Sequence, residues 1–214
     1  MLIDAATDNI NVLERRWGTP SRHTLEALDG APVPNIGDAL ERMGMMGSRI
    51  RALGPGSCLG PALTVWTREG DNLAIHRAMD EARPGDVLVV NGAGDLNRAL
   101  FGDILAARAL RAGIVGLVVD GCVRDAKAIT EAGFPVWCAG VCPAGPTKNG
   151  PGVVGGPIAC GGIVVRAGDL IAADPDGVAV VPLERCEQVA DEVKRIEAYE
   201  QSLRNGILKG GAHA

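Results

Sequence analysis

GDILAARALRAGIVGLVVDGCVRD, residues 102–125, carries the strongest fold signal in the chain. Apolar residues recur at helical spacing through the first half of this stretch, and Gly113 ends the predicted helix. Residues 114–119 then form a continuous apolar run, which is typical of a strand buried on both faces of a parallel sheet. The stretch therefore predicts a helix followed by a buried strand, as in an α/β fold.

Strand and helix signals alternate on both sides of this stretch. Upstream, we predict helices over 22–28 and 36–43, a strand over 61–66, a helix over 71–82 with Asp71 as its N-cap, and a strand over 86–91. Downstream, we predict a helix over 125–132 and strands over 135–138, 162–165, 169–173 and 177–181. The sequence thus indicates a single domain over 1–214, with its core at about 36–182 and a C-terminal helix over 183–206.

The segment 132–165 is rich in glycine and proline, and its one charged side chain is Lys148. Such a segment suits backbone that packs against a neighbour, either around the core or at a subunit contact. Lys148 is conspicuous in this setting.

The net charge of −5, from 21 basic and 26 acidic side chains, argues against a nucleic-acid partner. Acidic and basic residues interrupt the first 16 positions, so we expect no leader, no membrane partner and a cytoplasmic location. The six cysteines form no CxxC pair and are expected to be buried as small apolar residues.

Several enzyme classes lack their motifs here. The serines have no Gly-x-Ser-x-Gly context, and His76 lies in a predicted helix without an HExxH pattern. Residues 150–155 match a dinucleotide-binding glycine pattern, but Pro157 prevents the helix that must follow it.

One end of the predicted sheet gathers groups that suit an anionic ligand. The helix beginning at Gly102 presents unpaired N–H groups and a positive dipole end. The strand that follows delivers Asp120 and then Arg124 and Asp125. Arg124 could bind a carboxylate or keto-enolate bidentately, and Asp125 is a hard ligand for Mg²⁺. The alternative is that Arg124 and Asp125 only solvate a loop and cap a helix.

At these residues the sequence resembles the family of 4-hydroxy-4-methyl-2-oxoglutarate / 4-carboxy-4-hydroxy-2-oxoadipate aldolases and the regulator of ribonuclease E activity A. The matching motifs are Gly102-Asp103-Ile104-Leu105, Val118-Val119-Asp120-Gly121, Arg124-Asp125, Cys160-Gly161-Gly162 and Gly168-Asp169 to Asp176-Gly177-Val178. The resemblance implies an α-β-β-α sandwich related to swivelling β/β/α domains. It also implies homotrimers or hexamers with active sites at subunit interfaces.

The resemblance further implies roles for particular residues. Backbone of Gly102, Asp103, Ile104 and Leu105 would bind the pyruvyl carboxylate. Arg124 would contact substrate oxygens, and Asp125 would anchor Mg²⁺, Mn²⁺ or another divalent cation. In one departure from the family pattern, Ala128 stands where these aldolases usually carry Glu or Asp.

These features predict a metal-dependent class II pyruvate aldolase that cleaves 4-hydroxy-2-oxo dicarboxylates, with oxaloacetate decarboxylation as a side reaction. The resemblance places such an enzyme in aromatic compound catabolism. Lys148 would meet a distal substrate carboxylate or pair with an acidic side chain; in a competing route, it would form a Schiff base. Asp120 is a further candidate site residue. The alternative function is a non-enzymatic regulator that binds a ribonuclease.

Overall fold

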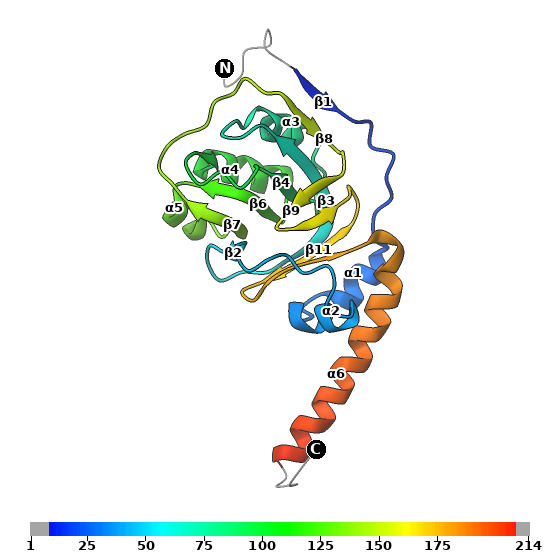
Figure 1. Ribbon diagram of the computed structural model, residues 1–214. Coiled ribbons are helices and arrows are strands. Elements are labelled where there is room, and N and C mark those ends of the chain that lie inside the picture. Colours follow the sequence, from blue (N-terminus) through cyan, green and yellow to red (C-terminus); the bar gives the residue numbers. More distant parts are fainter. Residues whose placement is uncertain (1–8, 209–214) are drawn as a thin grey trace.

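The computed structural model describes residues 9–208, so the ends of the predicted 1–214 domain lie outside the described residues. Within them, the chain forms four layers, with helices on the two outer sides of two layers of β-structure (Figure 1). This is the predicted α-β-β-α sandwich, and a long C-terminal helix extends from it.

The helices are α1 (Arg22–Leu28), α2 (Val33–Ala39), α3 (Leu73–Glu81), α4 (Asp103–Ala112), α5 (Ala126–Glu131), the 3-10 turn η2 (Leu183–Arg185) and α6 (Cys186–Leu208). The strands of the first half are β1 (Ile10–Val12), β2 (Arg51–Ala52), β3 (Cys58–Thr67), β4 (Val87–Asn91), β5 (Ala99–Phe101) and β6 (Gly116–Val123). Those of the second half are β7 (Val136–Val141), β8 (Gly152–Val154), β9 (Ile158–Cys160), β10 (Ile163–Val165), β11 (Leu170–Asp174) and β12 (Gly177–Val181).

The main sheet has the strand order β1-β8-β3-β4-β6-β7-β2, and its centre, β3-β4-β6-β7, is parallel. β3 joins the two β layers, because its first residues pair with β11 and the rest pair with β4. β5 pairs in parallel with the far end of β6 and leads directly into α4. The end of β6 therefore lies beside the beginning of α4.

Three apolar clusters fill the spaces between the layers. The first packs α3, α4 and α5 against the main sheet, with Ile75, Leu105 and Ile129 among its members. The second lies between the main sheet and the β9–β12 layer, and the third packs that layer against α1, α2 and α6. The strands predicted from continuous apolar runs are buried because both their faces meet one of these clusters.

Some predicted boundaries were wrong. The helix predicted over 36–43 is α2, which starts earlier, with Pro34 in its first turn, and ends before Glu41 and Arg42, whose positive φ angles break the helix. The N-cap of α3 is Asn72 rather than Asp71, although the Asp71 carboxylate accepts from Leu73 N. The C-terminal helix continues past residue 206 after a first turn of 3-10 type.

All six cysteines are buried and free, as expected. None of the helices described here is long and apolar enough to cross a membrane.

Candidate active site

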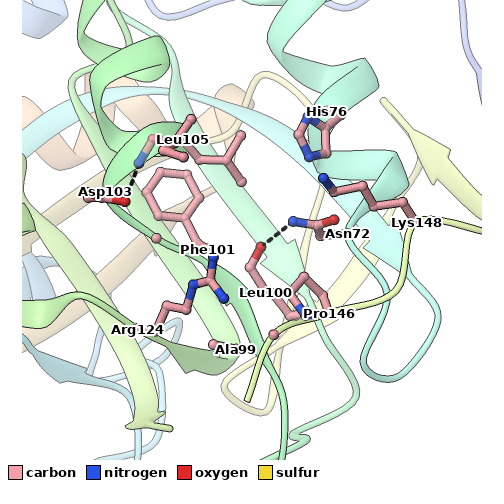
Figure 2. A pocket seen from close by; sticks show the side chains of 13 residues that line it. Asn72, His76, Ala99, Leu100, Phe101, Asp103, Leu105, Arg124, Pro146 and Lys148 are labelled. Atoms are coloured by element: carbon pink, nitrogen blue, oxygen red, sulfur yellow. Dashed lines mark hydrogen bonds between the residues drawn. The ribbon is translucent and has the colours of Figure 1, made fainter. Parts of the chain in front are cut away.

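A cleft of about 190 Å³ opens where α3, α4 and the end of β6 meet (Figure 2). Its walls come from the start of α3, the β5–α4 junction, the residue after β6 and the segment after β7. The lining residues are Asn72, His76, Ala99, Leu100, Phe101, Gly102, Asp103, Ile104, Leu105, Arg124, Gly145, Pro146 and Lys148. The cleft brings together the glycine-led helix start, Arg124 and Lys148, which the sequence analysis singled out separately.

The first turn of α4 forms one wall. Gly102 is the N-cap, and its carbonyl accepts from Ala106 N at 3.0 Å, so the helical ladder begins one turn into the helix. Ile104 N donates to the Asp103 carboxylate at 2.7 Å. The first turn of α4 lines the cleft, so the positive end of the helix dipole lies at the cleft wall. This position favours binding of an anionic group in the cleft.

Arg124 is fixed to this wall through its backbone, because Arg124 N donates to Phe101 O at 2.9 Å. Figure 2 shows its guanidinium below the Phe101 ring. Arg124 Nε lies 3.3 Å from Asp125 Oδ2, and both side chains are about 40% exposed, at 42% and 40%. The guanidinium can therefore reach a ligand in the cleft with its remaining N–H groups.

Asp125 does not cap helix α5 with its side chain. It occupies the N-cap position with φ 57° and ψ 34°, and its carboxylate makes no capping hydrogen bond. A non-glycine residue in this left-handed region is uncommon and tends to occur at functional sites. The structure therefore disagrees with the capping alternative for Asp125.

Two glycines permit these close approaches. A Cβ on Gly102 would lie 2.7 Å from Asp125 Oδ2 and 3.2 Å from Arg124 Cγ. A Cβ on Gly145 would lie 2.9 Å from an Arg124 terminal nitrogen. A side chain at either position would displace the side chain of Asp125 or Arg124, so glycine at both positions lets these charged groups keep their places.

The opposite wall carries Asn72, His76 and Lys148. Asn72 Nδ2 donates to Leu100 O at 2.9 Å, and Asn72 Oδ1 has no partner within residues 9–208, which leaves a buried acceptor beside the cleft. Half-buried Lys148 extends toward His76 (Figure 2), and no acidic side chain of residues 9–208 forms an ion pair with it. The carboxylate of a bound ligand could form an ion pair with the Lys148 ammonium group.

His76 is buried, at 3% exposure, and its Nδ1 lies 3.5 Å from Arg108 Nη1. Burial, followed by the positive charges of Lys148 and Arg108, lowers the pKa of His76 to about 4. The imidazole is therefore neutral near pH 7. The sequence favoured a core or surface histidine here, and the structure places it in the core and also at the cleft.

Asp120 does not line the cleft. It is buried within β6, where its carboxylate pairs with Arg49 and accepts from Gly161 N at 3.1 Å. Its other oxygen has no hydrogen-bond partner in the described part of the chain. These contacts tie β6 to the turn between β9 and β10.

The donor set beside the cleft suits a hard cation. Residues 9–208 contain no group of three or more His, Cys, Asp or Glu side chains arranged around one metal position. The Asp125 carboxylate is partly exposed and free of a capping role. Mg²⁺ keeps several waters and often takes only one or two protein carboxylates, so Asp125 fits such an ion.

Asn72 was not predicted from the sequence as a site residue, and His76 was not connected with this site. Asn72 is the N-cap of α3 and His76 lies within that helix, about 30 positions before the Gly102 motif. The sequence offered one indication, the polar Asp71-Asn72 pair at the start of a predicted helix. The position of that helix beside α4 is set by the tertiary fold and could not be predicted from local sequence.

Fold and cleft together define an α-β-β-α sandwich with a cationic pocket at the end of a parallel strand. The chain belongs to the RraA-like family, whose model, described as Aldolase/RraA, matches residues 33–180. A protein of Halalkalibacterium halodurans, provisionally named a 4-hydroxy-4-methyl-2-oxoglutarate aldolase, is 41% identical over 82% of this chain and 84% of its own.

Two solved structures have closely similar folds. Streptomyces coelicolor RraAS2, described as an unusual member of the RNase ES inhibitor RraA family, gives a TM-score of 0.80 at 31% identity, covering 88% of this chain and 98% of its own. An uncharacterized protein of Pseudomonas syringae gives a TM-score of 0.80 at 26% identity, covering 91% and 96%.

Proposed function

We propose that this protein is a carbon–carbon lyase, a divalent-metal-dependent aldolase that cleaves 4-hydroxy-2-oxo dicarboxylates to pyruvate and a second oxo acid. Oxaloacetate decarboxylation is the expected side reaction. The observation that carries the proposal is the cleft itself, where Arg124 faces the N-terminus of α4 and the Asp125 carboxylate is held free of helix capping. The similarity to relatives named as aldolases supports it.

Asp125 would hold Mg²⁺ or Mn²⁺ in this scheme. When bound, such a cation supplies Lewis-acid polarisation of the 2-oxo group. The hard carboxylate of Asp125 and its partial exposure are the features that support this assignment.

The protein groups bind and orient the oxo acid. The first-turn amides of α4, over Gly102, Asp103, Ile104 and Leu105, would receive the pyruvyl carboxylate, which would displace the Asp103 carboxylate from Ile104 N. As the C3–C4 bond breaks, its electron pair stays on C3 and delocalises into the enolate of pyruvate, while the C4 hydroxyl gives its proton to water and becomes the second carbonyl. A proton from water then adds to C3 and gives pyruvate. The Arg124 guanidinium would stabilise the negative charge that develops on the enolate oxygen.

Lys148 would bind the distal carboxylate of the substrate from the opposite wall. Lys148 lies near the His76 ring, which is neutral near pH 7, and Arg108, which contacts that ring, is paired with Asp80. The positive charge that attracts an anion at this wall is therefore that of Lys148. In the competing Schiff-base route, Lys148 would instead attack the substrate carbonyl. Borohydride treatment with pyruvate traps such an adduct, and we expect no trapped mass on Lys148.

The decisive experiment measures pyruvate release with a lactate dehydrogenase coupled assay. The substrates are 4-hydroxy-4-methyl-2-oxoglutarate, 4-carboxy-4-hydroxy-2-oxoadipate and oxaloacetate. We expect turnover with Mg²⁺, loss of turnover after EDTA and recovery when Mg²⁺ is restored. Pyruvate release that survives complete metal removal would contradict the metal-dependent mechanism.

A second candidate function is regulation of a ribonuclease, favoured by the 31% identity to RraAS2. A pull-down with a ribonuclease, combined with no pyruvate release from any of the three oxo acids, would support this function over the aldolase. Assembly into trimers or hexamers also stays a prediction, and light scattering of the purified protein tests it.

A further inference from the structure

We propose that Asp71 is a positioning residue that clamps the segment carrying Lys148 and so sets the binding of the distal substrate carboxylate. This inference rests on the proposed function for its substrate. The clamp itself rests only on contacts between Asp71 and residues 147–150.

Both carboxylate oxygens of Asp71 are used in this clamp. Oδ2 accepts from Thr147 Oγ1 at 2.7 Å and from Asn149 N at 2.6 Å. Oδ1 accepts from Gly150 N at 3.0 Å and from Leu73 N at 3.0 Å. Thr147 and Asn149 are the residues on either side of Lys148, so one carboxylate holds the chain immediately before and after the lysine.

Backbone hydrogen bonds complete the connection. Thr147 N donates to Gly70 O at 2.9 Å, and Asn72 N donates to Thr147 O at 3.0 Å. The segment is therefore attached to the residues that begin α3, whose Asn72 and His76 line the same cleft. A shift of residues 147–150 would move Lys148 relative to the other groups of that wall.

Asp71 is held as a carboxylate. It is fully buried, and burial alone would raise its pKa, but the hydrogen bonds from Asn149, Leu73, Thr147 and Gly150 together lower the pKa below its usual value. An uncharged side chain at this position would leave buried donors without acceptors. The clamp therefore depends on the negative charge and on both oxygens.

Asp71→Asn is the informative substitution. An asparagine keeps the shape, but it replaces one oxygen with an NH₂ group. This group would face either the N–H groups of Leu73 and Gly150 or that of Asn149, so at least one backbone donor loses its acceptor whichever way the amide is turned. We expect the KM for 4-hydroxy-4-methyl-2-oxoglutarate to rise about tenfold, the value of one charge-assisted contact. For 4-hydroxy-2-oxopentanoate, which lacks the distal carboxylate, KM and kcat should stay within about twofold.

A double-mutant cycle tests whether Asp71 acts through Lys148. Lys148→Met removes the ammonium group and should itself raise the KM for the dicarboxylate. In the Lys148→Met background, Asp71→Asn should cause little further change, because the contact that it disturbs is already gone. Additive effects of the two substitutions would overturn the proposal.

Hydrogen exchange gives a readout that needs no activity. The amides of Asn149 and Gly150 donate to Asp71, so their exchange should accelerate in Asp71→Asn, and unchanged exchange would overturn the clamp. If this variant does not fold, Thr147→Val removes a single donor to Asp71 and should raise the same KM more mildly. Equal KM changes for both substrates in Thr147→Val would also contradict the proposal.

Asp169→Asn is the matched control. Asp169 is likewise buried and accepts two backbone N–H groups, from Arg166 and Leu183, but it lies outside the cleft. This variant should lose stability without any difference between the two substrates. Failure of the proposed function would look different, since the wild-type protein would then release no pyruvate, while hydrogen exchange would still report on Asp71.

Discussion

The Asp125 carboxylate lies 3.3 Å from Arg124 Nε because Asp125 has a left-handed backbone conformation, with φ 57°. In a regular strand, consecutive side chains point to opposite faces. The left-handed turn after β6 instead brings the two charged groups together at the edge of the cleft. This backbone conformation is destabilising for a residue other than glycine, and such strained residues cluster at functional sites.

Replacing Asp125 with glycine should therefore separate stability from function. Asp125→Gly relieves the left-handed conformation, and we expect the free energy of unfolding to rise by about 1 kcal/mol. The same variant should lose Mn²⁺ binding and pyruvate release. Urea denaturation and calorimetric Mn²⁺ titration measure the two effects.

Ala93→Gly is the control for this substitution, since Ala93 also has a positive φ, of 59°, and does not line the cleft. It should gain stability with no change in Mn²⁺ affinity. If Asp125→Gly still binds Mn²⁺ as tightly as the wild type, the assignment of Asp125 as the metal ligand is wrong.

Arg124→Lys should lower kcat by about 10²- to 10³-fold, the usual effect of removing one group that stabilises developing negative charge. Lysine keeps the charge but cannot form the planar, bidentate contact of the guanidinium. The coupled assay measures this loss. Arg185→Lys, on the far helical layer where Arg185 pairs with Glu41, should leave kcat unchanged. Wild-type turnover in Arg124→Lys would remove Arg124 from the mechanism.

Gly102→Ala should reduce activity by about 10²-fold, because the new methyl group would lie 2.7 Å from Asp125 Oδ2 and push the carboxylate and guanidinium out of place. The backbone itself tolerates alanine, since φ at Gly102 is −147°. Gly206→Ala is the control: it meets open space inside a helix and should be slightly stabilising and fully active. Full activity of Gly102→Ala would show that the close approach is unimportant.

The sequence could predict the sheet centre because strands such as β4 and β6 are buried on both faces and are therefore continuously apolar. The three-residue strands β5 and β8 gave no such signal. They are too short for a periodic pattern, and they form only because β6 and β3 offer them free edges.

The part of the candidate site that comes from consecutive elements of the chain could be predicted from the sequence. α4 and β6 are consecutive, so the sequence alone brings Gly102 and Arg124 near one sheet edge. Asp120 lies four positions before Arg124, so in a regular strand both side chains would lie on the same face of the sheet. Asp120 instead lies away from the cleft, because the β6–β7 pairing is irregular between Val119 and Cys122 and the alternation of faces is broken there. Asn72 depends on a hydrogen bond to Leu100, which no local pattern reveals.

Ala128 is the position at which the chain departs from its family's usual acid, and restoring that acid should strengthen metal binding. Ala128 is exposed in the first turn of α5, three residues after the N-cap residue Asp125. We expect Ala128→Glu to bind Mn²⁺ about tenfold more tightly by calorimetry, within the range typical of groups that support metal ligands. Ala132→Glu adds the same charge at the other end of α5 and should change the affinity little. Equal effects of the two substitutions would indicate only a general effect of charge.

His76 should make folding stability depend on pH. Its pKa in the folded protein is about 4, below the ordinary 6.5, because burial, then Lys148 and Arg108, disfavour the charged ring; Asp80 opposes them, and Arg77 adds a smaller lowering effect. As the pH falls below 6.5, the unfolded chain binds a proton that the folded chain does not bind until about pH 4. The free energy of unfolding should therefore fall by up to about 3 kcal/mol across this window.

Urea denaturation of the wild type and His76→Asn at pH 4.5 and 7.5 measures this contribution. The variant has no group that titrates here, so its stability should change less between the two values than that of the wild type. His23→Asn serves as the control, because His23 is exposed on α1 and its loss should leave the wild-type pH dependence intact. If His76→Asn shows the same loss of stability on acidification as the wild type, other groups account for the pH dependence, and the cleft holds a histidine that protonates freely.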